Sequence, residues 1–157
     1  MSVPDAIARL REHGDFGPLC EAIPYARFLG LSLALVDGHV VGTMAFSPPI
    51  VGNPVIGALH GGTLGALMEW TAVGHLLHAV ESESVPKTIN VTIEYLRSAG
   101  LEDTHARCHV LRLGRRVAVD IEDWYSEDLL FADRQSRPIR LLRHAESFAL
   151  NHCAYSS

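Results

Sequence analysis

Hydrophobic residues recur at helical spacing in three stretches of the chain. Residues 4–13 and 18–29 each place apolar side chains on one face, which predicts two short helices, the second ending at Gly30. The stretch 61–80 also follows a helical pattern, but it is apolar on nearly all sides. A helix of that kind must be enclosed by the rest of the protein, so we expect 61–80 at the centre of the fold.

Between and after these stretches the period changes to that of β-strands. Asp37-Gly38 separates two short apolar runs, at 31–36 and 39–46, which is a strong β-hairpin signal. Residues 47–59 hold three prolines and two glycines and are expected to form a loop. Further strands are predicted after the next proline, at 88–95, 105–113 and 116–125, followed by a polar loop at 126–137 and a last strand within 138–150.

The strand that follows the long helix shows a clear alternation. Its apolar positions are Ile89, Val91, Ile93 and Tyr95. Thr88 is therefore expected on the opposite, polar face. Short turns between successive strands predict an antiparallel sheet that curls around the helix, so the expected fold class is α+β, in one domain over 1–157 with an N-terminal helical segment at about 1–30. Because a small single sheet leaves open edges, we expect a second copy to pair with it.

The composition fits an ordinary globular protein. The chain has 157 residues, of which 48% are hydrophobic and 20% charged, enough for one core. Its formal charge of -5 argues against a nucleic-acid partner, which would need a basic face. The start of the chain shows no secretory signal. Polar residues and prolines interrupt the stretch before residue 81, which holds a single charged residue, and this argues against a membrane span. We expect a cytoplasmic protein.

Cysteine and histidine spacings give no metal or redox motif. Cys20, Cys108 and Cys153 are far apart and odd in number, which favours free thiols in a reducing compartment. His75 and His78 lie three residues apart in the predicted helix but lack a third ligand at zinc-site spacing. No metal is therefore expected.

Glu69 is the only Asp, Glu, Lys or Arg between Asp37 and Glu81. Its sequence neighbours are apolar, so we expect its carboxylate to lose hydration, which is costly without a partner. Desolvation would raise the pKa of this carboxyl group and make it a better base near neutral pH. The alternative is a structural glutamate paired with an arginine from another strand, such as Arg97 or Arg116.

The long helix opens at His60-Gly61-Gly62. First-turn N–H groups lack helical partners, glycines let a ligand approach the backbone, and the helix dipole adds positive character. Such a place suits a carbonyl oxygen that gains negative charge during a reaction. The alternative is a tight turn in which His60 satisfies a loop carbonyl. A hydroxyl at Thr88 could orient a water, although alone it fits an ordinary strand threonine.

Three segments together resemble one family. The segments NPVIGALHGGTLGALMEW, KTINVTIEYLRSA and VLRLGRRVAVDIE are similar to PaaI-type hotdog-fold thioesterases, and the resemblance runs from about residue 22 to residue 125. In that family an antiparallel sheet wraps a long helix, two protomers join their sheets, and dimers often pair into tetramers. The resemblance implies a thioester hydrolase acting on acyl-CoA without a metal, with sites between protomers and with coenzyme A entering only as part of the substrate.

The resemblance also implies roles for particular residues. Glu69 would be the general base or the nucleophile, and the Gly61 N–H, positioned by His60, would polarise the thioester carbonyl. Asn53 matches an asparagine that precedes the histidine in many members, and Thr88 matches a position that helps to place the water. Expected substrate contacts are Gly62, Arg97, Arg115 and Arg116, the arginines facing the phosphates of CoA. The acyl pocket is expected to be lined by Leu64, Leu67, Met68 and Trp70 together with residues of the partner protomer.

Two other functions remain open at this point. A hotdog dehydratase would usually carry an Asp-His pair on the catalytic segment, and none is found here. A non-catalytic acyl-CoA binding protein is favoured by the section from Ser126 onward, which fits the family poorly. Relatives close with a clean alternating strand, whereas here charged residues crowd that region, which puts the register of the last strand in doubt.

Overall fold

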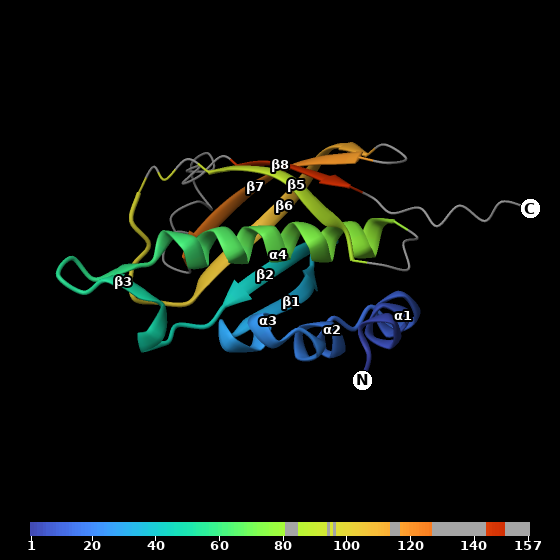
Figure 1. Ribbon diagram of the computed structural model, residues 1–157, viewed down its shortest axis with the longest axis horizontal. Coiled ribbons are helices and arrows are strands. Elements are labelled where there is room, and N and C mark those ends of the chain that lie inside the picture. Colours follow the sequence, from blue (N-terminus) through green and yellow to red (C-terminus); the bar gives the residue numbers. More distant parts are fainter. Residues whose placement is uncertain (81–84, 94, 96, 114–116, 127–143, 150–157) are drawn as a thin grey trace, which may run out of the picture.

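The computed structural model describes residues 1–80, 85–93, 95, 97–113, 117–126 and 144–149 (Figure 1). The helices are α1 (Val3–His13), α2 (Gly17–Ala22), α3 (Pro24–Phe28), the 3-10 turn η1 (Pro48–Ile50) and α4 (Gly61–Ala79). The strands are β1 (Leu31–Val36), β2 (His39–Met44), β3 (Val51–Asn53), β4 (Ala58–Leu59), β5 (Lys87–Ile93), β6 (Thr104–Leu113), β7 (Val117–Ser126) and β8 (His144–Ala149).

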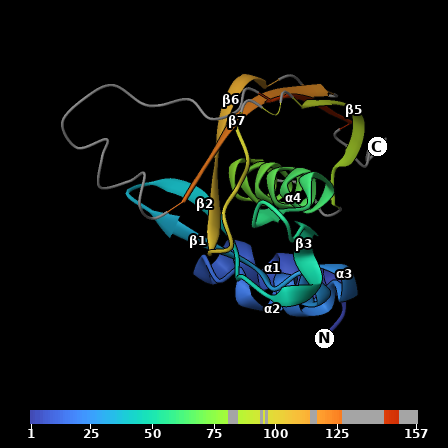
Figure 2. The same ribbon diagram turned by 90° about the vertical axis from the view of Figure 1, so that its left-hand side faces the viewer.

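Six strands form one sheet in the order β1-β2-β6-β7-β8-β5, and each neighbouring pair is antiparallel. The end-on view shows this sheet curling around α4 (Figure 2). β3 and β4 form a separate two-stranded ribbon. The predicted α+β class, with an antiparallel sheet around a long central helix, is confirmed, and β5 and β1 are the two ends of the sheet.

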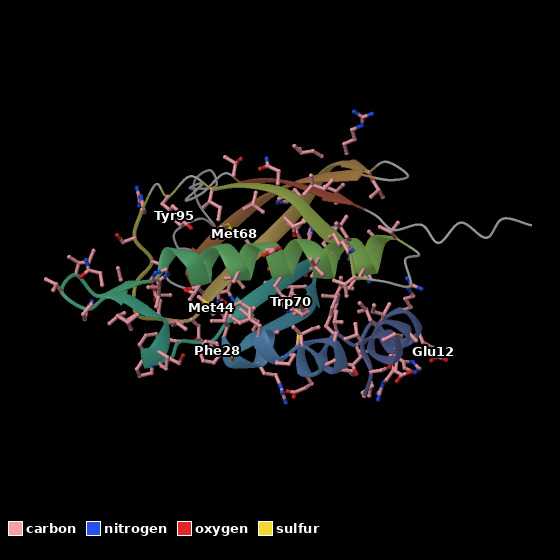
Figure 3. All side chains as sticks on the ribbon, in the orientation of Figure 1. Glu12, Phe28, Met44, Met68, Trp70 and Tyr95 are labelled. Atoms are coloured by element: carbon pink, nitrogen blue, oxygen red, sulfur yellow. The ribbon has the colours of Figure 1, made fainter. Side chains whose placement is uncertain are left out.

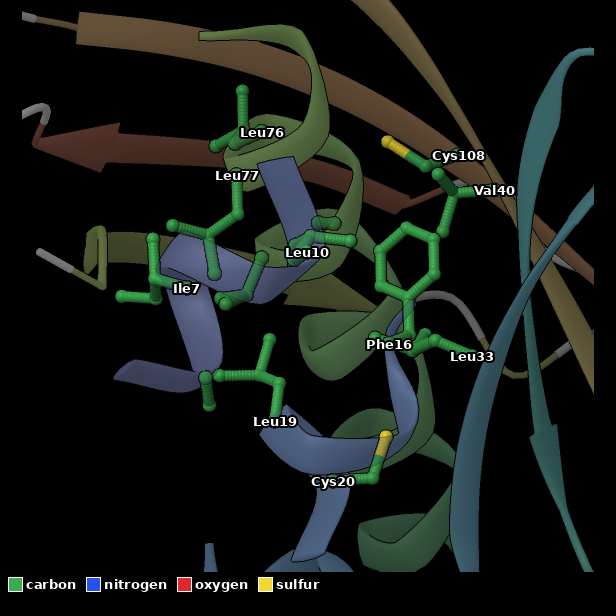
Figure 4. Packing of buried hydrophobic residues seen from close by; sticks show 13 residues of the cluster. Ile7, Leu10, Phe16, Leu19, Cys20, Leu33, Val40, Leu76, Leu77 and Cys108 are labelled. Carbon is green, nitrogen blue, oxygen red and sulfur yellow. The ribbon is translucent and has the colours of Figure 1, made fainter. Parts of the chain in front are cut away.

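α4 is buried on several sides because two hydrophobic clusters meet it. The first half of the helix packs into a cluster with Leu29, Met44 and Ile50. The second half meets α1, α2 and the strands in another cluster (Figure 4). Its larger members are Ile7, Leu10, Phe16, Leu19, Leu33, Leu76 and Leu77. The N-terminal helices therefore cover part of α4 that the sheet does not reach, which matches the enclosure expected from its apolar sequence.

The β-hairpin predicted at Asp37-Gly38 is confirmed. Asp37 and Gly38 both have positive φ, 50° and 79°, as a two-residue type I′ connection requires. β1 and β2 pair on either side of this turn, from Val36 with His39 to Leu31 with Met44. The long helix and the strands near 88–95, 105–113 and 116–125 also lie where they were predicted.

Two predicted elements are wrong in detail. The helix expected over 18–29 is two helices, because Pro24 lacks an N–H and holds Ile23 in an extended conformation. The loop expected over 47–59 contains η1, β3 and β4, since its prolines leave 51–53 and 58–59 free to pair.

The last strand predicted from the sequence is present, although only part of its predicted range is described. β8 lies within the predicted strand 138–150 and pairs with both β7 and β5, which gives its register. Residues 138–143 and 150, and 127–137 of the predicted loop, lie outside the described residues. Among the helices that the structure describes, none has the length and apolar character needed to cross a bilayer.

Candidate active site

The entrance to α4 is positioned by the β3–β4 ribbon. The His60 N–H donates a hydrogen bond to the Ile50 carbonyl at 2.9 Å, and the Leu59 N–H donates to the Ala99 carbonyl at 3.0 Å. Gly52 approaches His60 so closely that a Cβ on it would lie 2.5 Å from the His60 Cα. Only a glycine lets the two backbones come this near, so the ribbon that the sequence did not predict fixes where α4 begins.

His60 is the N-cap of α4. Its Nδ1 accepts a hydrogen bond from the Gly62 N–H at 3.0 Å, in the place usually taken by the oxygen of a Ser or Asp side chain. This bond needs an unprotonated Nδ1, which assigns the ring proton of neutral His60 to Nε2. The imidazole therefore serves a backbone N–H rather than a loop carbonyl.

The Gly61 N–H is the open donor of this turn. The His60 carbonyl accepts hydrogen bonds from the Thr63 N–H at 3.0 Å and the Thr63 hydroxyl at 2.7 Å, while the Gly62 N–H is taken by the imidazole. Within the described part of the chain, no hydrogen bond is donated by the Gly61 N–H. Of the two predicted glycines, Gly61 is the one that can polarise a ligand carbonyl.

Glu69 and Thr88 are brought together from different elements. The Thr88 hydroxyl of β5 donates a hydrogen bond to Glu69 Oε1 on α4 at 2.5 Å. A short bond of a hydroxyl to a carboxylate oxygen is of the charge-assisted kind. The bond occupies one carboxylate oxygen and leaves Oε2 to face a ligand or a water.

A β-bulge turns Thr88 toward Glu69. In the pairing of β5 with β8, Thr88 lies opposite Phe148 and Asn90 lies opposite Ser147, so Ile89 is an extra residue without a partner. An extra residue reverses the alternation beyond it. Thr88 therefore joins the helix-facing side of β5, while Ile89 is 57% exposed. The regular alternation predicted the opposite face for Thr88 and is wrong here.

The expected burial of Glu69 is also wrong for a single protomer, in which this side chain is exposed. Successive helical residues point in different directions, so its sequence neighbours do not surround it in space. Leu64, Leu67 and Met68 lie in the core against Met44, with at most 2% of their surface exposed. They are core residues and do not line an open acyl pocket. The direct partner found for Glu69 is Thr88, not Arg97.

The other predicted residues lie in varied surroundings. The Asn53 side-chain oxygen accepts hydrogen bonds from the Val55 N–H at 3.0 Å and the Ile56 N–H at 3.4 Å, so it closes the turn of the β3–β4 ribbon. Arg97 is exposed beyond the end of β5. Arg115 and Arg116 lie outside the described residues.

Tyr95 is a neighbour of this turn whose sequence pattern predicted a strand face but no role in the site. Its hydroxyl donates a hydrogen bond to the Gly61 carbonyl at 2.8 Å, and its ring lies above the first turns of α4 (Figure 3). Ile93 approaches the next turn, where a Cβ on Gly65 would lie 2.9 Å from its Cδ1. Gly61 and Gly65 are four residues apart, so both lie on the same face of α4 and leave room there for Tyr95 and Ile93. This glycine spacing is visible in the sequence.

Two titratable groups away from this turn have displaced pKa values. Burial lowers the pKa of His75, and the nearby His78, His39 and His109 act in the same direction. Burial raises the pKa of the Cys20 thiol, an effect that Trp70 partly offsets. Among the residues that the structure describes, no three His, Cys, Asp or Glu side chains are grouped to hold a metal ion.

Comparison with known proteins agrees with this fold. The model of the Thioesterase superfamily matches residues 56–120, from the β3–β4 ribbon into β7. No curated protein matches the sequence. A solved protein from Chromobacterium violaceum is 26% identical over 96% of this chain and 99% of its own, with a TM-score of 0.71.

Two further solved proteins, one described as a thioesterase and one as a putative thioesterase, have a similar structure. One, from Haemophilus influenzae, is 19% identical over 92% of this chain and 94% of its own, with a TM-score of 0.72. The other, from Ralstonia eutropha JMP134, is described as a putative thioesterase related to phenylacetic acid degradation; it is 19% identical over 92% of this chain and 99% of its own, with a TM-score of 0.69. These similarities and the order of the strands show that the chain has the hotdog fold.

Proposed function

We propose that this protein hydrolyses acyl-CoA thioesters to a free acid and coenzyme A. The observation that carries the proposal is Glu69, a carboxylate on the open face of α4 whose Oε1 is held by the Thr88 hydroxyl. The same helix begins with the Gly61 N–H, which donates no hydrogen bond to any of the residues that the structure describes. A base and an oxyanion donor are the groups that thioester hydrolysis requires. The match to the Thioesterase superfamily supports this class of reaction.

The reaction proceeds through a tetrahedral intermediate. Glu69 Oε2 accepts a proton from a water, whose oxygen bonds to the acyl carbon while the carbonyl electrons move to the oxygen that faces the Gly61 N–H. The C–S bond then breaks, the acid is released, and the thiolate of CoA takes the proton from Glu69. Direct attack by a Glu69 carboxylate oxygen on the acyl carbon would instead break the C–S bond, release the CoA thiolate and form an anhydride. Water then hydrolyses the anhydride to the free acid and the Glu69 carboxylate, and the thiolate takes the released proton. A single turnover in ¹⁸O-water distinguishes the two routes, because only the anhydride route can place ¹⁸O in Glu69.

The two groups act across a dimer. Gly61 and Glu69 lie eight positions apart in α4, which is about 12 Å along the helix axis. An acyl carbon must lie about 3 Å from both the nucleophile and the oxyanion donors, so one protomer does not supply both to one substrate. β5, which holds Thr88, ends the sheet and has a free edge to pair with a second copy. We propose a homodimer with Glu69 from one protomer facing Gly61 of its partner, and such dimers can pair into a tetramer.

Basic side chains would meet the phosphates of CoA at the rim of this site. Arg97 is exposed close to the end of β5, two residues beyond Tyr95. Arg115 and Arg116 are proposed to join it in the dimer. An arginine forms paired hydrogen bonds with a phosphate, so each substitution by alanine should raise KM for acyl-CoA more than it lowers kcat.

Release of thiol from a panel of short, medium, long and aromatic acyl-CoAs tests the proposal. Wild-type protein should release CoA from at least one class, and Glu69→Gln should lower kcat by about 10²-fold or more. Glu12→Gln is the matched control, because Glu12 is an exposed helical glutamate on α1. Binding without thiol release across the whole panel would favour a non-catalytic acyl-CoA protein, and enoyl-CoA hydration without thiol release would favour a dehydratase.

Mixed dimers test whether the site is shared. Gly61→Pro removes the open N–H at the first helical position, where proline is common, and His60 already has the extended ψ of 127° that a following proline prefers. The proline Cβ would lie 3.0 Å from Tyr95 Cε1, so the half-exposed ring has to shift slightly in this variant. Glu69→Gln and Gly61→Pro should each be inactive alone. Co-expressed, half of the dimers are mixed and each has one complete site, so about a quarter of wild-type activity should return. A mixture that stays inactive would place the site within one protomer.

A further inference from the structure

Tyr95 reaches the first turn of α4 from just beyond the end of β5. Its hydroxyl donates to the Gly61 carbonyl at 2.8 Å. The ring lies against the glycine, where an added Cβ would be 3.0 Å from Cε1 and 3.1 Å from Cζ of the tyrosine. The tyrosine ring therefore occupies the space that a side chain at position 61 would fill. Tyr95 is in direct contact with the residue whose N–H is the open donor.

The ring of Tyr95 is partly buried, with 52% of the residue's surface accessible. A phenylalanine at this position would keep the ring packing, so the contribution of the hydroxyl can be separated from it. The directed contact is the hydroxyl bond. A helical carbonyl already accepts the N–H four residues later and has a second lone pair, which the tyrosine hydroxyl fills. The bond therefore restrains the peptide group between Gly61 and Gly62.

With this bond, each of the two peptide groups beside Gly61 is held. The peptide before it is fixed through the His60 carbonyl, which accepts from the Thr63 N–H and hydroxyl. The peptide after it is fixed twice, because Gly62 N–H donates to the imidazole and Gly61 C=O accepts from Tyr95. Glycine has the widest backbone freedom of any residue, so these bonds replace the restraint that a side chain would give.

We propose that Tyr95 is a positioning residue for the oxyanion donor. Its hydroxyl holds the Gly61–Gly62 peptide and its ring packs on Gly61, and together they restrict rotation about the Gly61 backbone bonds, which set the direction of the adjoining His60–Gly61 peptide and its N–H. This inference rests on the proposed thioester hydrolysis. A donor that is already oriented needs no reorganisation as negative charge develops on the substrate oxygen. The loss of the tyrosine hydroxyl therefore raises the barrier of the chemical step and leaves substrate binding nearly unchanged.

Tyr95→Phe tests this with little change in shape. The variant should lower kcat about tenfold, corresponding to one lost neutral hydrogen bond, with KM within about twofold of wild type. Tyr25→Phe is the matched control, because Tyr25 is a comparably exposed tyrosine on α3 that stacks on Phe28. It should leave both constants unchanged. An unchanged kcat for Tyr95→Phe, or a raised KM at constant kcat, would overturn the proposal.

Amide hydrogen exchange gives a second measurement that does not need turnover. The Gly62 N–H, bonded to the imidazole, should exchange about tenfold faster in Tyr95→Phe and at the wild-type rate in Tyr25→Phe. If wild-type protein releases no thiol from any acyl-CoA, the proposed function fails, and exchange alone decides whether Tyr95 restrains the turn. Equal exchange in Tyr95→Phe and wild type would show that it does not.

Discussion

The bulge at Ile89 predicts which residue of β5 serves Glu69. Thr88→Val removes the hydroxyl that donates to Glu69 Oε1 and keeps the branched shape of the side chain. Thr88→Ser keeps the hydroxyl and is the conservative comparison. Because Ile89 is the unpaired residue of the bulge and is exposed, a hydroxyl moved to position 89 should not reach the carboxylate. The double variant Thr88→Val/Ile89→Thr should then resemble Thr88→Val.

The size of the effect follows from the kind of bond. A hydrogen bond to a charged group contributes about 1.5–3 kcal/mol, which corresponds to about 10- to 150-fold in rate if all of it is lost from the transition state. The water that takes part in the reaction can replace part of the lost bond to Oε1 in the assembled site, so the lower end applies. We expect kcat to fall about tenfold in Thr88→Val and to stay within about threefold in Thr88→Ser.

Steady-state thiol release by wild type, the two single variants at Thr88 and the double variant tests which residue of β5 serves Glu69. If Thr88→Val/Ile89→Thr recovers the wild-type kcat, residue 89 faces α4 and the bulge assignment is refuted. If Thr88→Val itself has the wild-type kcat, the hydroxyl does not position Glu69, whatever the register. Circular dichroism of all variants at the assay temperature checks that β5 remains paired.

Two further predictions concern stability. Gly52→Ala should lower the free energy of unfolding by about 1–3 kcal/mol, because the alanine Cβ would lie 2.5 Å from the His60 Cα. Urea unfolding measures this change, and Gly100→Ala is the control. Equal urea midpoints for Gly52→Ala and wild type would contradict the prediction. His75 has a pKa below its usual value of about 6.5, so the unfolded chain binds more protons than the folded one as pH falls below that value, and stability decreases. The urea midpoints at pH 7.5 and 5.5 should therefore differ less in His75→Leu than in wild type. The control His13→Gln, which changes an exposed histidine, should keep the full difference. An unchanged pH dependence in His75→Leu would show that His75 does not cause the loss of stability at low pH.

Local signals predicted much of the fold because they depend on residues close in sequence. Asp37-Gly38 adopts positive φ wherever it connects two strands, and the apolar stretch at 61–80 needs enclosure in any context. The β3–β4 ribbon was missed because it depends on Gly52 meeting His60, a contact between segments that no short pattern encodes. Its prolines indicated a loop, and they do bound it, but they do not prevent two short strands from pairing between them.

The sequence singled out the residues of the candidate site but did not show how they are arranged. Glu69, Gly61 and Thr88 were all identified, but the face of Thr88 depends on its pairing with β8, far along the chain. Alternation alone predicts that Ile89, and not Thr88, faces the helix, because apolar residues occupy every second position from Ile89 to Tyr95. A bulge is decided by the partner strand, so one strand read alone cannot reveal it.

The exposure of Glu69 bears on how the site is assembled. Sequence neighbours suggested a carboxylate already removed from water, yet a single protomer leaves it exposed beside the free edge of β5. In the proposed dimer the partner covers this face, so the low-dielectric surroundings that strengthen a base and an oxyanion donor form only on assembly. Hydrolysis should therefore depend on protomer association: the rate per protomer should fall on dilution through the dimer dissociation range measured by sedimentation. A rate per protomer that stays constant through that range would show that one chain is sufficient.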